Sequence, residues 1–170
     1  MEWTGQVYAD QPEVAAETFI EAPPDQVWAL VSDIFLMPVL STELQEVRWL
    51  DDAAGPAVGH RFTGRSAHPS LGQWETTSTI VECDEPRRFA WAVGDPQYPS
   101  STWRFTLRPE GTGTVLEQST RMGPARSGLS LAIDAMPDKE QKIVFVRLRE
   151  YETGFKHNLA AIKERAEGTA

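Results

Sequence analysis

Alternating apolar and polar positions predict a first strand from Glu13 to Glu21, because a period of two is typical of a half-buried strand. The prolines and aspartate at residues 23–25 end this strand and favour the start of a helix. The apolar stretch Ile34–Leu40 follows, and Pro38 would disrupt a strand at that point, so we expect helical turns there. Two short helices therefore follow the first strand.

From Glu46 onward the period remains two, and turn residues recur at regular intervals, as in an antiparallel meander. We expect six more strands, so that the predicted sheet has seven. Their predicted positions are around Val47 and Trp49, and then Gly59–Ser66, Trp74–Cys83, Arg87–Val93, Thr102–Arg108 and Thr114–Met122.

The strongest periodicity lies in the last third of the chain, where apolar residues recur at steps of three or four from Val144 to Ala166. A helix from about Asp138 to Glu167 would be roughly 45 Å long. Asp138 is its candidate N-cap, and Gly154 is expected to mark a bend or a close contact. Residues 123–136 are predicted as a mobile connector with one helical turn, which would cover one end of a binding site.

The order of these elements predicts an α+β domain, in which a curved antiparallel sheet of seven strands wraps a long C-terminal helix. A chain of 170 residues suits one domain, and we assign it to residues 13–168, after an N-terminal extension at 1–12.

Charge and cysteine content narrow the possible partners. The net charge is −9 and no segment forms a dense basic stripe, so nucleic acid is a poor candidate. A stable membrane insertion is not expected, since no apolar run approaches the roughly 20 residues of a span. With the single cysteine Cys83 and no signal-peptide pattern, we expect a cytoplasmic protein that is a monomer or a homodimer.

Several spaced segments resemble the SRPBCC superfamily. More narrowly, the chain is similar to the polyketide cyclase/dehydrase branch, a relative of START lipid-transfer domains and of the birch pollen allergen family. The segments that carry the resemblance are Ala22–Asp33, Val58–Gly64, Pro86–Trp91 and Gly113–Leu116.

The resemblance implies a helix-grip fold with a hydrophobic cavity between the concave sheet and the terminal helix. Strand parity agrees in part, because aromatic residues fall on one face of the predicted strands and arginines on the other. The alternative is that the same rings fill a solid core. The residues that we expect to line a ligand site are Phe62, Trp74, Trp91, Trp103, Phe105, Gln118, Tyr151 and Phe155.

Polar residues near these positions are also candidates. Trp74, Thr76, Ser78 and Ile80 share one parity, and we favour this set as inward-facing over the set that begins with Glu75. Gln118 and Tyr151 could each offer a polar group to a ligand, or Gln118 could simply bond to nearby backbone. His68 precedes Pro69 and is expected in a turn.

Enzyme motifs are absent from the sequence. His60 and His68 would lie roughly 26 Å apart on one extended strand, and Cys83 has no partner at ligand spacing, so neither a metal site nor a cofactor is predicted. No nucleophile elbow or dinucleotide fingerprint is present.

The sequence is therefore compatible with three functions. The first is a carrier or sensor for a hydrophobic or amphipathic small molecule. The second is a polyketide cyclase, aromatase or dehydratase that uses the same cavity, which rests on the resemblance alone. The third is a protein-interaction module, suggested by the acidic first third and by the apolar stretch Ile34–Leu40.

Overall fold

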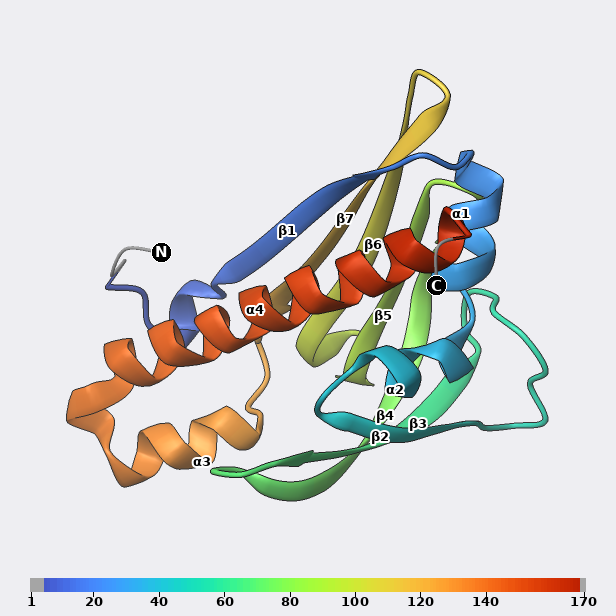
Figure 1. The fold of residues 1–170 in the computed structure, drawn as a ribbon. Helices are drawn as coiled ribbons and strands as arrows, with labels where there is room; N and C mark the ends of the chain where they lie inside the picture. The colour runs from blue at the N-terminus through green and yellow to red at the C-terminus, as the bar shows by residue number, and fades with distance from the viewer. Residues whose placement is uncertain (1–4, 169–170) are drawn as a thin grey trace.

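The computed structural model describes residues 5–168, so the first four residues of the predicted extension lie outside the described residues. Figure 1 shows a single sheet with one long helix lying across it. Among these residues the sheet has seven strands in the order β1-β7-β6-β5-β4-β3-β2, and all neighbouring pairs are antiparallel. The predicted fold class is confirmed.

The observed elements follow the predicted order. The strands are β1 (Glu13–Ile20), β2 (Leu44–Trp49), β3 (Arg61–His68), β4 (Gly72–Asp84), β5 (Arg88–Asp95), β6 (Tyr98–Glu110) and β7 (Gly113–Met122). The helices are α1 (Pro24–Val31), α2 (Met37–Leu40), α3 (Gly128–Ala135) and α4 (Glu140–Ala166), with short 3₁₀ turns η1 (Tyr8–Asp10), η2 (Ile34–Leu36) and η3 (Pro137–Lys139).

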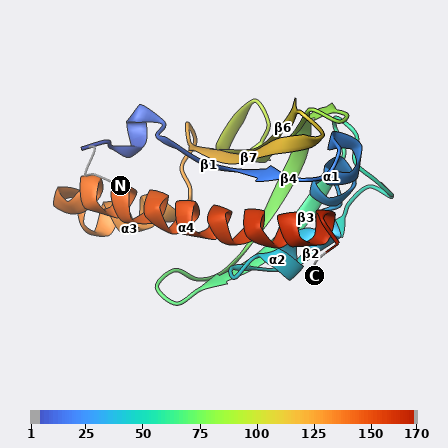
Figure 2. The same ribbon diagram turned by 45° about the horizontal axis from the view of Figure 1, so that its top comes forward.

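The sheet curves around α4. In Figures 1 and 2, β1 and β7 lie to one side of the long helix, and β2 and β3 lie to the other. Along its length α4 packs mainly against β1, and it also contacts α1, α2, α3 and β7. The two edges of the sheet are therefore placed on opposite sides of one helix, as in a helix-grip fold.

Strand register fixes which side chains face α4. Phe89, Phe105 and Gln118 are paired in one row across β5, β6 and β7, and Trp91, Trp103 and Thr120 form the next row. Since paired residues lie on the same face of a sheet, all of them point to the concave side. The register of β3 and β4 likewise places Trp74, Thr76 and Ser78 on that side, because Ser78 pairs with both Phe62 and Val93. The favoured parity of this strand is confirmed.

Two groups of buried apolar residues fill the space near the ends of α4. One joins α1 and the C-terminal half of α4 to the sheet and includes Trp28, Phe89 and Ile162. The other joins α3, the start of β1 and the N-terminal and middle parts of α4, and includes Val14, Leu148 and Phe155. Trp103 packs against both groups from a half-buried position, so it marks the middle of the concave face.

Two local predictions were wrong, and one of two alternatives for Gly154 is excluded. The connector contains the eight-residue helix α3 instead of one turn, because Ser127 Oγ accepts a hydrogen bond from Leu129 N and Ser130 Oγ accepts one from Ser127 N. Asp138 does not cap α4, which begins two residues later after η3 and has no side-chain cap. A Cβ added to Gly154 would meet no atom within 4 Å, so no close contact requires glycine there.

Candidate functional site

The eight predicted lining residues lie on the concave face of the sheet or on α4, in three settings. Phe62, Trp91 and Phe105 are buried in the aromatic part of the core, where Trp91 contacts the other two rings at centroid distances of 6.3 and 6.1 Å. Trp103, Tyr151 and Phe155 meet where α4 crosses the sheet. Trp74 is half-buried on β4 opposite Ser66, and Gln118 is buried on β7.

Rings from the sheet and from α4 meet in the middle of the concave face. The Trp103 ring packs edge-on against Tyr151 at 5.0 Å and against Phe155 at 6.0 Å between centroids, and the two α4 rings are nearly parallel. We call these three residues the aromatic junction. Edge-to-face pairs of this kind are favourable by about 0.5–1.5 kcal/mol beyond their burial, so the junction helps to hold α4 on the sheet.

Among the hollows formed by the described residues, two lie at the surface. One, of about 210 Å³, lies between η2 and the loop after β2 and is lined in part by Ile34, Trp49 and Pro56. The other is lined by polar side chains of the N-terminal segment and Arg121. Neither lies between the sheet and α4, where the aromatic junction occupies part of the space predicted to be open.

Two polar atoms on the concave face have no hydrogen-bond partner among the described residues. The Gln118 amide lies 3.4 Å from the Asn158 amide, and Asn158 turns its Nδ2 atom toward Leu40 O and Gly154 O, to which it donates at 3.3 Å. One end of the Gln118 amide thus has no described partner, and neither has Ser78 Oγ. Every described side-chain N or O atom that is completely buried does have one. The Gln118 and Ser78 atoms must therefore reach accessible space, although both residues are more than nine-tenths buried.

Accessible space on the concave side is also indicated by the half-buried residues around these two atoms. Thr76, Val93, Ser101, Trp103 and Tyr151 all point to the concave side or belong to the inner face of α4, and each is half-buried. Gln118 and Ser78 lie in the register rows on either side of Trp91 and Trp103. The site thus combines aromatic surface with free hydrogen-bonding groups.

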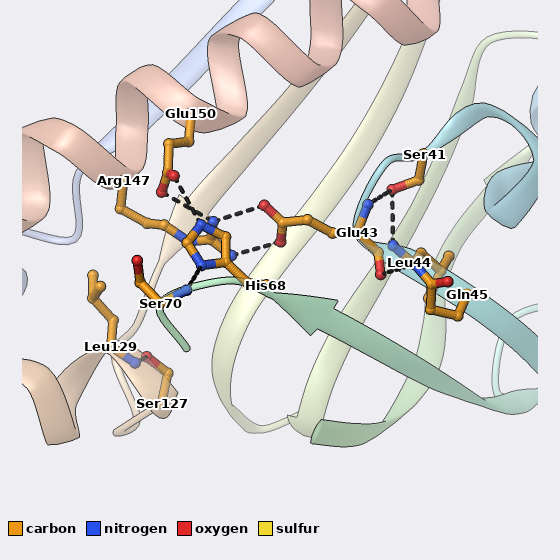
Figure 3. A network of polar contacts seen from close by, with 10 residues as sticks. All are labelled: Ser41, Glu43, Leu44, Gln45, His68, Ser70, Ser127, Leu129, Arg147 and Glu150. Atoms are coloured by element: carbon orange, nitrogen blue, oxygen red, sulfur yellow. Dashed lines mark hydrogen bonds and ion pairs between the residues drawn. The ribbon is translucent and has the colours of Figure 1, made fainter. Parts of the chain in front are cut away.

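A charged network lies beside the aromatic junction, and sequence reasoning missed most of it. Figure 3 shows Arg147 and Glu150 of α4 facing Glu43, which precedes β2, and His68, the last residue of β3. The Arg147 Nη1 and Nη2 atoms each donate to a Glu43 oxygen at 2.8 Å, and Nη1 also donates to Glu150 Oε1 at 3.2 Å. His68 Nε2 lies 2.8 Å from Glu150 Oε2, so His68 is part of this network. His68 is the last residue of β3 and does not lie in a turn.

One sequence signal could have revealed the network. Arg147 lies three residues after Val144 and four before Tyr151, on the apolar face of α4. An arginine at such a position requires a buried partner, and its side chain is indeed only 6% exposed. The partner could not be identified from sequence, because Glu43 is 104 residues away.

Burial and charge shift two pKa values in this region. Burial raises the pKa of the Tyr151 hydroxyl, and the nearby Arg147 guanidinium, 4.5 Å from the ring centroid, only partly opposes this. Burial disfavours the charged form of Arg147, but its hydrogen bonds and proximity to Glu43 outweigh that cost and raise its pKa. Arg147 is therefore charged and Tyr151 neutral at physiological pH.

Neither a metal cluster nor a membrane-spanning helix is found within the described residues. Within residues 5–168 no three His, Cys, Asp or Glu side chains come together in a way that could hold a metal ion. No helix in the same range combines the length and the apolar character that a membrane span needs.

Known structures share the fold over nearly the whole chain. A polyketide cyclase-like protein from Corynebacterium glutamicum is 33% identical, with a TM-score of 0.65 and 91% of each chain covered. The di-domain ARO/CYC StfQ from the steffimycin biosynthetic pathway is 15% identical with a TM-score of 0.71, and the match covers 92% of this chain and 51% of StfQ. Ara h 8.0201 is also 15% identical, with a TM-score of 0.55 and coverage of 89% and 97%.

No functionally curated protein matches the chain. Residues 11–150 match the family described as polyketide cyclase / dehydrase and lipid transport. Together with the helix-grip arrangement of the sheet around α4 and the likeness to the Corynebacterium protein, this match shows that the chain belongs to that family, within the SRPBCC superfamily.

Proposed function

We propose that this protein binds a small amphipathic molecule on the concave face of the sheet, beside the aromatic junction, and acts as its carrier or sensor. The observation that carries the proposal is the pair of unpartnered polar groups, one end of the Gln118 amide and Ser78 Oγ, which open to accessible space on a face otherwise lined by rings. Because both groups reach accessible space, a ligand that hydrogen-bonds to the Gln118 amide and to Ser78 would replace their contacts with solvent.

The composition of the site indicates the ligand class. The aromatic junction supplies flat apolar surface, and the free groups nearby are neutral hydroxyls and an amide. The charges of Arg147 and Glu43 are directed at each other. A largely apolar molecule with a few hydroxyl or carbonyl groups therefore matches the site better than a strongly charged one. This class agrees with the family description, which includes both polyketide enzymes and lipid transport.

Two neighbouring threonines on β4 provide a matched test. Thr76 points to the concave face, opposite Gly64, whereas Thr77 points to the convex face, opposite Thr63. Thr76→Trp should fill the space beside the junction, and Thr77→Trp adds the same ring on the outside. The assay is native mass spectrometry of freshly purified protein, followed by titration with the fluorescent probe 1-anilinonaphthalene-8-sulfonate.

We expect the wild type and Thr77→Trp to bind the probe with similar affinity, and Thr76→Trp to bind at least tenfold more weakly. Equal binding by both variants would show that the probe lies elsewhere. A wild type that retains no small molecule and binds no probe would contradict the proposal itself.

A second candidate function is cyclase-type or dehydratase-type catalysis at the same site. It is favoured by the Tyr151 hydroxyl, because this acid lies at the edge of the site in contact with a charged arginine and could donate a proton to a bound carbonyl group. Tyr151→Phe should then abolish turnover of a poly-β-ketone substrate while leaving binding within a few-fold of wild type. Unchanged turnover would remove Tyr151 from the chemistry.

A further inference from the structure

We infer that Glu43, Arg147, Glu150 and His68 form a latch, which ties the N-terminal half of α4 to the β2–β3 edge of the sheet and must open for a ligand to reach the concave face. The tie itself follows from the contacts among these residues. Its role in ligand access rests on the proposed function.

The position of the latch follows from how α4 is held. One side of the helix packs along β1, and its C-terminal half also contacts α1 and α2. On the other side, the N-terminal half faces the end of β3 and the segment before β2, and the polar side chains of Figure 3 bridge these elements. Separating these side chains would free this side of α4 while its packing on β1 stays intact.

The two sheet-side partners are held ready for the helix by local bonds. Ser41 Oγ accepts hydrogen bonds from the backbone N–H groups of Glu43 and Leu44, which fixes the turn before β2. His68 Nδ1 accepts a hydrogen bond from Ser70 N, so in the neutral ring the proton is on Nε2, which donates to Glu150. The backbone at Glu43 and the ring of His68 thus each have a bond within their own segment.

The exposure of the partners makes the latch releasable. Arg147 is 6% exposed, but the side chains of Glu43 and Glu150 are 29% and 38% exposed. When the pair separates, both carboxylates can therefore be hydrated at once, and the long arginine side chain can reach water from its helix. Breaking a fully buried pair would instead leave an unpaired charge in the interior, at a cost of several kcal/mol.

Two carboxylates share one guanidinium in the latch, since Glu43 and Glu150 both contact Arg147. Tyr151 is a further titratable group in contact with Arg147.

The latch is in contact with the aromatic junction. The Arg147 guanidinium lies over the Tyr151 ring, and this ring packs against Trp103. Movement of Arg147 would therefore remove one of the contacts that hold Tyr151 over the concave face. Arg147 therefore links the latch to the aromatic junction through Tyr151.

Hydrogen exchange measured by mass spectrometry tests the tie without any ligand. Glu43→Gln keeps the shape of the side chain and removes the charge that pairs with Arg147. We expect exchange of the amides in residues 140–152 to rise about tenfold, with the C-terminal half of α4 unchanged. Asp51→Asn is the matched control, because it breaks an exposed pair with Arg61 on the same sheet and should leave α4 exchange at the wild-type rate.

Glu150→Gln is the second variant. Glu150 is more exposed than Glu43, so removal of its charge should lower the free energy of unfolding less. It should raise the same exchange about threefold. A folded variant of either kind with exchange within twofold of wild type over residues 140–152 would overturn the latch, and so would an equal rise in Asp51→Asn.

The rate of entry of 1-anilinonaphthalene-8-sulfonate, measured by stopped-flow fluorescence, tests the role in access. Glu43→Gln should speed association about tenfold. If exchange rises but association does not, the tie exists and does not control access, which overturns the inference. If exchange rises and no variant binds the probe, the binding proposal fails while the tie stands.

Discussion

Replacement of Gln118 by methionine separates the role of this residue in folding from its role in binding. Methionine has nearly the same length and volume as glutamine, so the change leaves packing largely intact. It removes a buried amide whose hydrogen bond to Asn158 is 3.4 Å long, beyond the 2.7–3.2 Å of an ordinary bond. The amide therefore gives little to stability, while part of it is removed from water.

The magnitude follows from these two terms. A fully buried polar group without a partner costs about 1–3 kcal/mol. The Gln118 amide reaches accessible space at one end, so its cost is at the low end of that range, about 1 kcal/mol, and the long contact with Asn158 returns little of it. We expect Gln118→Met to raise the free energy of unfolding by about 1 kcal/mol and the melting temperature by roughly 2–4 °C. Affinity for an amphipathic ligand should fall about tenfold, because one hydrogen bond to the ligand is lost.

Urea unfolding followed by circular dichroism gives the free energy, provided that the slope against urea concentration is unchanged. Gln97→Met, at the exposed turn between β5 and β6, is the control and should alter neither stability nor binding. A loss of 1 kcal/mol or more in Gln118→Met would refute the reasoning, since it would show that the amide is well satisfied in the fold.

Two further predictions concern α4. Gly154→Ala should raise the free energy of unfolding by about 1 kcal/mol in the same urea assay, because a Cβ at this helical position meets no atom within 4 Å; a loss of stability would mean that the position is constrained. The pKa of Tyr151 is raised in the folded protein. Its neutral hydroxyl therefore contributes to the free energy of unfolding, fully below the unfolded-state pKa of about 10, and this contribution is lost as the pH rises through the folded-state pKa. Absorbance at 295 nm should therefore show one tyrosine that ionises late, and Tyr151→Phe should remove that step; three tyrosines ionising together in the wild type would contradict it.

Local sequence patterns were enough to predict most of the fold. The period-two segments and their turn residues placed the strands within a few residues, because each strand has one buried face and each turn uses glycine, proline or aspartate. The steps of three and four in the last third gave the long helix for the same reason. The helix α3 was underestimated, since it is short and begins with a serine cap at Ser127 instead of a clear apolar stripe.

The site was predictable only in part. Strand parity placed Trp91, Trp103 and Gln118 on the concave face, because side-chain direction along a strand is a local property. Their mutual contacts depend on register and on the path of α4, which no local pattern specifies. The meeting of Trp103 with Tyr151 is therefore a result of tertiary structure.

By itself the sequence determined the order of strands and helices, the faces that they bury and the long helix that must be covered, since these follow from periodicity within each segment. Only the tertiary structure decided that Arg147 finds Glu43 and that the Gln118 amide meets the Asn158 amide. The physical reason is that pairing and desolvation depend on distances between segments far apart in the chain, and those distances exist only after the sheet has curved around α4.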